Sequence, residues 1–310
     1  MNRVSIGAAL GEGFSLMRRK PLSVLSWGLL QAAISGGAWM LYLPMYATIF
    51  SRAAAARGAG AGAGAAPDPA MMAQMMQMQG LNLLLSLASA AVTVVVYCAA
   101  FRAVLFPDQR RFAYMRLSMA ELLLGVVGVV AYFAFIIALV VVMIPVIVVV
   151  GIFSVAHQPG IGVLVGVLVG IAAAVAAIYV GLRFSLLGPL TVRDKTLNVS
   201  DAWAITKGHV ASLFGIAACQ VLIVLFFEIV LVLVLLLLAA GVLGVTFGLD
   251  GIRSFMQHPT APSPAQIIPW AMFGILLFVP IAGGMIAFMA APWARVLNDL
   301  THSDALEAFA

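Results

Sequence analysis

Charged residues are scarce in this chain of 310 residues: 9% are Asp, Glu, Lys or Arg, whereas 64% are hydrophobic. A soluble fold of this composition could not cover its surface with polar side chains, but a bilayer supplies the apolar solvent that such a chain needs. The scarcity of charge therefore excludes an ordinary soluble domain. It indicates a membrane protein.

The sequence also lacks the motifs that usually carry catalysis. It has no Walker loop, no Gly-x-Ser-x-Gly elbow, no His-Glu-x-x-His motif and no cysteine pair with zinc spacing. Cys98 and Cys219 both fall near the expected cytoplasmic ends of spans, where reducing conditions disfavour a structural disulfide. We therefore expect no catalytic residue and no cofactor, and we interpret the protein as non-enzymatic.

What the chain does contain is a set of six long apolar runs. They cover residues 22–50, 81–101, 122–150, 161–182, 213–249 and 268–291. Each run exceeds the roughly 20 residues that a helix needs to cross a bilayer core. The runs predict an all-α fold: a polytopic membrane helical bundle of six transmembrane helices, forming one domain over residues 1–310.

Basic residues are distributed unevenly between the two sides of this predicted bundle. Thirteen fall on one side, and only Arg52, Arg57 and Arg253 fall on the other. Because Lys and Arg in short loops resist translocation, this bias places both termini in the cytoplasm, with the protein in the bacterial inner membrane. The basic side favours anionic lipid headgroups. Nucleic-acid binding is not expected, since no basic stripe with interleaved aromatic residues accompanies the charge.

An internal repeat emerges when the chain is shifted against itself by 189 residues. The shift aligns Glu12 with Asp201, Phe14 with Trp203, Arg18 with Lys207, Ser23 with Ser212, and Gln31 with Gln220. Arginines at the cytoplasmic ends of the even spans recur as well, at Arg102, Arg183 and Arg295. These patterns predict three parallel helical-hairpin repeats, each entered through an interfacial amphipathic helix.

The amphipathic stretches and the span ends supply candidates for contact with lipid headgroups. Long basic side chains and tryptophan favour the membrane interface. The candidates are Arg18, Arg19, Lys20, Arg102, Arg183, Trp203, Lys207 and Arg295. A cation at a helix C-terminus also complements the helix dipole, so each arginine has a structural explanation as well.

Glu228 is the only acidic residue deep within an apolar run. An ionised carboxylate in hydrocarbon is costly, so we expect Glu228 to face the bundle interior or a cavity, or to be protonated. Gln220 lies about two helical turns earlier on roughly the same face. Gln31 adds a third polar group if the repeats pack symmetrically. These residues suit a proton- or cation-linked path, or a polar pocket for a lipid headgroup. The alternative is simple hydrogen bonding between helices.

A stripe of small residues marks the fourth run. Gly162, Gly166, Gly170 and Ala174 follow one another at intervals of four residues. Such a stripe lets another helix approach closely. We expect this contact within the same bundle, because six spans provide many internal neighbours, and the oligomeric state stays open.

Residues 51–80 are predicted to form an external low-complexity loop, rich first in Ala and Gly and then in Met. The methionines are Met71, Met72, Met75, Met76 and Met78. Thioethers at these spacings could hold a soft ion such as Cu(I). The simpler interpretation is an amphipathic entry into the second span, and we favour it over metal binding.

Three short motifs resemble a known pattern. They are Arg183-Phe-Ser-Leu-Leu-Gly-Pro189, Ala202-Trp203-Ala-Ile-Thr206-Lys207-Gly208 and Leu213-Phe214-Gly215. The pattern is similar to that of bacterial six-span proteins related to the membrane domain that some glycerophosphodiester phosphodiesterases carry ahead of their catalytic domain. Because the catalytic barrel of that family has no counterpart here, the resemblance implies a membrane module without the enzymatic activity.

The sequence thus favours a non-enzymatic module that binds membrane lipids, anionic on the cytoplasmic side, or a membrane protein partner. Two alternatives stay open. One is a small transporter or channel that uses Glu228, which must then change its charge or ligand state during a cycle. The other is an accessory role in lipid or glycerophosphodiester metabolism.

Overall fold

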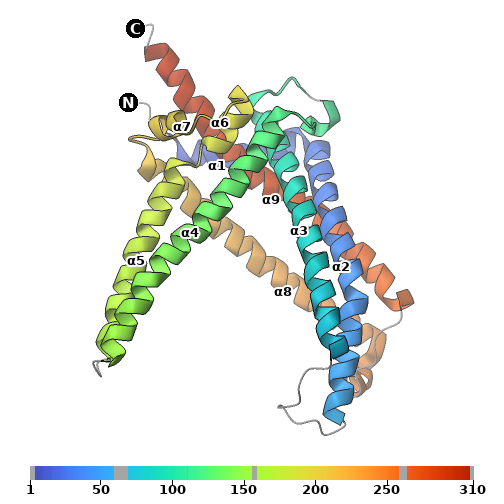
Figure 1. Cartoon of the computed structure of the whole chain (residues 1–310). Helices are drawn as coiled ribbons and strands as arrows, with labels where there is room; N and C mark the ends of the chain where they lie inside the picture. Colours follow the sequence, from blue (N-terminus) through green and yellow to red (C-terminus); the bar gives the residue numbers. More distant parts are fainter. Residues whose placement is uncertain (1–3, 59–68, 110, 156–158, 258–263, 308–310) are drawn as a thin grey trace. The chain divides into compact units, whose positions relative to one another are not determined.

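In the computed structural model, no strand occurs within the residues that the structure describes, which are 4–58, 69–109, 111–155, 159–257 and 264–307. The elements are α1 (Ile6–Arg19), α2 (Pro21–Gly58), α3 (Pro69–Leu105), the 3₁₀ turn η1 (Arg111–Tyr114), α4 (Met119–Val155), α5 (Pro159–Arg183), α6 (Leu187–Asp194), α7 (Val199–Ile205), α8 (Val210–Gln257) and α9 (Pro264–Glu307) (Figure 1). Six of the described helices are long and apolar enough to cross a membrane. The predicted all-α, multi-pass character is confirmed.

Each predicted apolar run lies inside one long helix, but the helices extend beyond the runs. The clearest case is the segment 51–80, predicted as a loop, which is helical at both ends because α2 continues to Gly58 and α3 begins at Pro69. Ala, Met and Gln are strong helix formers, and this propensity outweighs the low complexity of the segment. Pro69 suits the first helical position, where its missing N–H has no partner within the helix.

Contacts divide the chain into two compact units, which are described separately. Unit 1 comprises Met1–Arg19, Val94–Ala218 and Ala287–Ala310, and unit 2 comprises Lys20–Thr93 and Cys219–Ile286. Unit 1 thus holds α1, α4, α5, α6 and α7 with the adjoining ends of α3, α8 and α9. Unit 2 holds α2 and the remaining parts of those three helices. A single domain over residues 1–310 stays a prediction.

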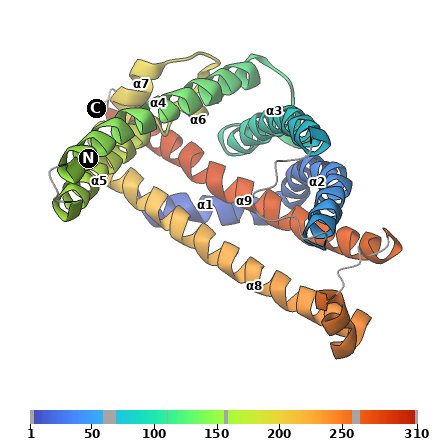
Figure 2. The same ribbon diagram turned by 60° about the horizontal axis from the view of Figure 1, so that its bottom comes forward.

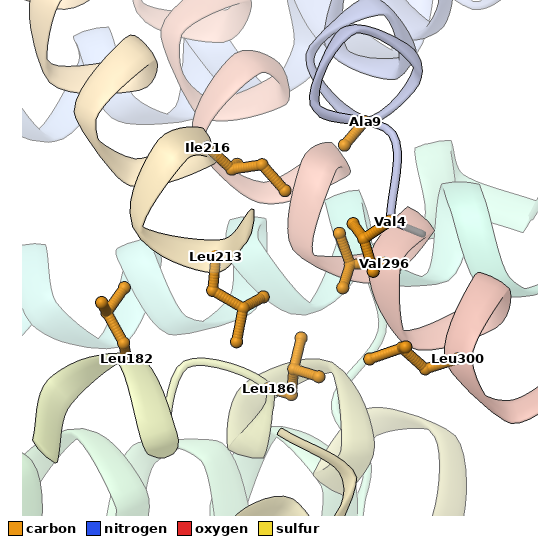
Figure 3. Close-up of a cluster of buried hydrophobic side chains, with 8 residues drawn as sticks. All are labelled: Val4, Ala9, Leu182, Leu186, Leu213, Ile216, Val296 and Leu300. Atoms are coloured by element: carbon orange, nitrogen blue, oxygen red, sulfur yellow. The ribbon is translucent and has the colours of Figure 1, made fainter. Parts of the chain in front are cut away.

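Unit 1 has a hydrophobic core formed by segments that are far apart in the sequence (Figure 3). The buried side chains are Val4, Ala9, Leu182, Leu186, Leu213, Ile216, Val296 and Leu300. They come from α1 and its N-terminal approach, the end of α5 and the turn after it, the start of α8 and the end of α9. Because protein encloses these side chains, the core fixes where the ends of these four helices meet.

Within unit 1, α4 and α5 form a hairpin and run side by side (Figures 1 and 2). Gly162 and Gly166 of α5 are buried. A Cβ at Gly162 would lie 2.6 Å from Cβ of Phe153 on α4, and a Cβ at Gly166 would lie 3.1 Å from a valine methyl of α4. A Cβ at Gly170 would meet no described atom within 4 Å, and Ala174 is exposed. The first half of the small-residue stripe therefore lies against α4, and in the second half no described atom packs that closely on Gly170.

Replacing Gly166 by Leu should lower the stability of the purified protein in detergent by about 1–3 kcal/mol, because the added side chain pushes α5 away from α4. Gly170→Leu is the matched control, since a Cβ there meets open space, and it should leave the thermal midpoint unchanged or raise it slightly through helix propensity. Equal losses in the two variants would contradict close packing at Gly166.

Unit 2 contains a closer helix crossing, between α2 and α9, that the sequence did not single out. A Cβ at Gly28 would overlap the carbonyl oxygen of Val279, and a Cβ at Gly283 would overlap the carbonyl oxygen of Val24. The two backbones are therefore in direct contact at this point. Only glycine leaves room for such an approach.

Candidate functional site at the arginine-bearing helix ends

One side of the amphipathic helix α1 is anchored in unit 1. Ala9, Gly13 and Leu16 are buried. A Cβ at Gly13 would lie 2.9 Å from Cα of Phe288 on α9, so α1 approaches the α9 backbone closely at this glycine. The rings of Phe14 and Phe288 lie 5.3 Å apart, yet Phe14 is still 44% exposed. The helix thus holds an aromatic side chain partly outward.

The α1 basic surface consists of Gly11, Phe14, Ser15, Arg18 and Arg19, which line a cavity of about 520 Å³. Arg18 and Arg19 are exposed. Arg19 lies 3.9 Å from the Glu12 carboxylate, and an exposed pair at this distance contributes little to stability. The surface brings two guanidinium groups, a hydroxyl and an aromatic ring together, a combination that suits the phosphorylated headgroup of a lipid.

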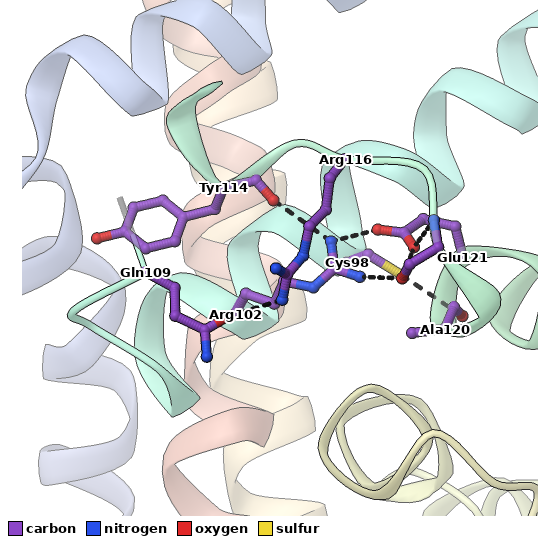
Figure 4. Close-up of polar contacts among 8 residues, drawn as sticks. Cys98, Arg102, Gln109, Tyr114, Arg116, Ala120 and Glu121 are labelled. Carbon is purple, nitrogen blue, oxygen red and sulfur yellow. Dashed lines mark hydrogen bonds and ion pairs between the residues drawn. The ribbon is translucent and has the colours of Figure 1, made fainter. Parts of the chain in front are cut away.

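Arg102, in the last turn of α3, is buried and fully engaged (Figure 4). It forms an ion pair with Glu121 of α4, and it donates hydrogen bonds to the Tyr114 carbonyl at 3.3 Å and to the Ser118 hydroxyl at 3.0 Å. Glu121 also accepts from the backbone N–H of Ser118 at 2.9 Å, as in a capping box. Protein groups thus surround this guanidinium. The sequence analysis did not identify Glu121 as the partner of Arg102. A signal was available, because Arg102 lies at the end of one span and Glu121 at the start of the next.

The connection between α3 and α4 adopts an unusual backbone at this ion pair. Phe112, Ala113 and Tyr114 have φ angles of 48°, 53° and 67°, in the left-handed region that residues other than glycine rarely occupy. The Tyr114 hydroxyl donates to the Pro107 carbonyl at 2.9 Å, which closes the connection on itself. Where the repeat pattern predicts an interfacial helix, the described part of residues 106–118 contains only this short turn.

Arg183, the last residue of α5, is equally buried, at 4% exposure, but its surroundings differ. Its guanidinium carbon lies 4.2 Å from the centroid of the Trp203 ring, and its Nη1 donates to the Thr206 hydroxyl at 3.4 Å. That hydroxyl donates to the Arg183 carbonyl oxygen at 3.0 Å. In the described part of the chain, Arg183 has no carboxylate partner, and its Nε is buried without an acceptor.

Arg295 completes the set of three arginines that the repeat pattern aligns. It is exposed, and its Nε lies 3.0 Å from the Asp299 carboxylate one turn further along α9. The three positions therefore differ in electrostatics: Arg102 is buried with an acid, Arg295 is exposed with an acid, and Arg183 is buried without one among the described residues.

Comparisons with protein-family models, curated proteins and solved structures returned no match. The resemblance to the membrane domain of glycerophosphodiester phosphodiesterases therefore stays a prediction, which rests on the motifs that begin at Arg183. The functional conclusion depends on the geometry of the chain's own residues.

The remaining lipid-interface candidates lie at or near the surface. Lys207 is exposed, Trp203 is 37% exposed, and Lys20 is half-buried and takes part in a contact. None of them is enclosed in the way that Arg102 and Arg183 are. The predicted interface residues thus separate into an outward group, to which Arg18 and Arg19 also belong, and two buried arginines.

The predicted intramembrane polar residues have different environments within unit 2. Gln220 is buried, whereas Gln31 is half-buried and its Oε1 has no hydrogen-bond partner among the described residues. Glu228 is exposed on α8, so the described residues do not enclose its carboxylate, and its expected role stays a prediction.

Metal binding finds no further support in the described residues. No group of three or more His, Cys, Asp or Glu side chains gathers there in a way that could hold an ion. On α3, Met72 and Met76 are exposed and Met78 is half-buried. The side chains of Met71 and Met75 lie outside the described residues. The soft-metal site stays an alternative that we do not favour.

Proposed function

We propose that the protein is a non-enzymatic integral membrane module whose α1 basic surface binds anionic lipid headgroups. The observation that carries this proposal is the exposure of Arg18 and Arg19 beside the partly exposed Phe14, on a helix whose other side is anchored in unit 1. An aromatic ring enters the membrane interface while neighbouring cations meet lipid phosphates. A helix held in place binds with less loss of conformational freedom than a mobile segment does.

The arginine bias of the sequence supports a cytoplasmic position for this surface. Both termini then lie in the cytoplasm, and α1 faces the leaflet whose surface is negatively charged. The identity of a membrane protein partner does not follow from the geometry, so lipid is the ligand that we propose.

Neutralising α1 should weaken the retention of anionic lipid. In the double variant Arg18→Gln/Arg19→Gln, each lost charge should reduce binding to phosphatidylglycerol by about 1 kcal/mol, or roughly fivefold. The measurement is the amount of phosphatidylglycerol that co-purifies with the protein from mixed micelles that contain equal phosphatidylcholine. Arg193→Gln is the control, because Arg193 is half-buried and pairs with Asp194 at 2.7 Å.

Two results would contradict this proposal. One is equal retention of phosphatidylglycerol by the double variant, the control and the wild type. The other is ion or solute flux in wild-type liposomes that is lost only with Glu228→Gln. That flux would favour the transporter alternative. We keep this alternative as the second candidate because Glu228 is an exposed acid within the candidate span Val210–Leu237.

An accessory role in glycerophosphodiester metabolism rests on the motif resemblance alone. It is compatible with a lipid-binding module, since such a module can hold the substrate of a neighbouring enzyme without acting on it. No described residue favours this role over the others.

A further inference from the structure

Arg183 carries a charge that the described residues do not balance. A guanidinium keeps its charge when it is buried, and a buried charge without a counterion is strongly unfavourable. We propose that Arg183, Trp203 and Thr206 form a binding site for a phosphate group, supplied by a lipid headgroup or by free phosphate. The site does not include the α1 basic surface, and it stands whether or not that surface binds lipid.

The free donors of Arg183 have the geometry that phosphate requires. Its single hydrogen bond runs from Nη1 to Thr206, and no acceptor among the described residues engages Nε or Nη2. In a guanidinium these two nitrogens share one edge, and their N–H bonds point the same way. Such an edge donates two parallel hydrogen bonds to two oxygens of one phosphate.

The neighbouring side chains hold the guanidinium in place before a ligand arrives. Trp203 lies 4.2 Å from the guanidinium carbon, and its ring is 5.3 Å from the ring of Phe184. A cation over a tryptophan face is attracted by the ring, which fixes the guanidinium plane. Thr206 is fully buried, and its hydroxyl is within 2.9 Å of the Ala202 carbonyl. The donor edge is thus oriented before phosphate arrives. Because Nε is buried, phosphate reaches it only when a neighbouring side chain shifts.

Arg102 shows what this chain does where it supplies the anion itself. Arg102 ends α3 much as Arg183 ends α5, and there the carboxylate of Glu121 completes the buried pair. At Arg183 an aromatic ring and a hydroxyl take the surrounding positions instead. Phosphate is the favoured anion, because α5 is an apolar candidate span and lipid phosphates are the abundant anions at the end of such a helix.

The test measures whether phosphate stabilises the protein through Arg183. Purified protein in an uncharged detergent is titrated with inorganic phosphate, with short-chain phosphatidylglycerol, or with the matching diacylglycerol, which lacks phosphate. A ligand that binds the folded state raises the thermal midpoint. Wild type should respond to a phosphate-bearing probe and not to diacylglycerol.

Arg183→Lys keeps the positive charge but removes the two-donor edge, so about tenfold more ligand should be needed for the same shift. Arg193→Lys is the matched control and should respond as the wild type does, because Arg193 already pairs with Asp194. A response to both phosphate probes identifies the phosphate group as sufficient. A response to phosphatidylglycerol alone identifies a lipid headgroup. Either result supports the site when Arg183→Lys weakens the response, because that variant leaves Arg18 and Arg19 unchanged.

The proposal is overturned if neither probe stabilises the wild type, or if Arg183→Lys responds as the wild type does. Should Arg183→Lys not fold, Trp203→Leu provides the second variant, since this ring is partly exposed and its loss leaves the guanidinium without its platform. A wild-type response in Trp203→Leu then overturns the proposal. If the phosphate site at Arg183 is overturned, the result for Arg18 and Arg19 is unaffected, because the two experiments change different residues.

Discussion

Glu121→Gln should destabilise the protein by about 3–5 kcal/mol, because it leaves the buried Arg102 guanidinium without a counterion. The side chains of Arg102 and Glu121 are only 3% and 5% exposed, so water cannot replace the lost charge. The amide oxygen of Gln can still accept from the Ser118 backbone N–H, so the substitution removes the charge and keeps the cap. The measurement is the free energy of unfolding by denaturant in detergent.

Two comparisons separate the ion pair from a general sensitivity to substitution. Glu12→Gln should cost less than about 1 kcal/mol, because Glu12 meets its arginine partners only at 3.9 Å and those partners are exposed. The double variant Arg102→Met/Glu121→Leu should be more stable than Glu121→Gln, since no buried charge is left unpaired. If its loss instead equals the sum of the losses in Arg102→Met alone and in Glu121→Leu alone, the two side chains do not act as a pair.

The existence of the long helices was predictable, because apolar runs of this length have few alternatives in a bilayer. Their ends were not. The apolar pattern marks only the apolar run, but the helices extend further: α2 continues through alanines to Gly58, and α3 already begins at Pro69. Helix propensity, which the apolar pattern does not report, decides the borders there.

The arginines show a second limit. Their recurrence at the span ends could be read from the chain, but of the partners of Arg102 and Arg183 only Glu121 left a signal in the sequence. The other contacts depend on how the connections fold. Three left-handed residues bring the Tyr114 carbonyl to Arg102, and the turn after α5 together with α7 brings Trp203 and Thr206 to Arg183. Repetition in sequence therefore predicted three similar positions, and the structure shows three different electrostatic environments.

Close helix contacts show the same limit for glycine. Regular spacing drew attention to Gly162 and Gly166, which do pack on α4, and equally to Gly170, beside which there is open space. Gly28 and Gly283 carry the tighter crossing of unit 2, and both lie outside that stripe. A stripe of small residues indicates that a second helix can approach closely. The residue at which the two helices cross depends on the position of that second helix.

Gly283→Ala should destabilise the protein by about 2–3 kcal/mol, although alanine is the better helix former, because its single added methyl overlaps backbone. A Cβ at Gly283 would overlap the Val24 carbonyl oxygen and would lie 3.2 Å from the Gly28 nitrogen, and neither group belongs to a flexible side chain that could move aside.

The same substitution on the same helix has the opposite expected sign at Gly274. There a Cβ meets no described atom within 4 Å, so Gly274→Ala should be neutral or stabilising by up to about 1 kcal/mol through helix propensity. The measurement is the thermal midpoint of Gly283→Ala and of Gly274→Ala in the same detergent. If both variants shift in the same direction, or if Gly283→Ala matches the wild type, α2 and α9 are not in backbone contact. A loss confined to Gly283→Ala places the crossing of the two helices at this glycine, because helix propensity alone would have raised both midpoints.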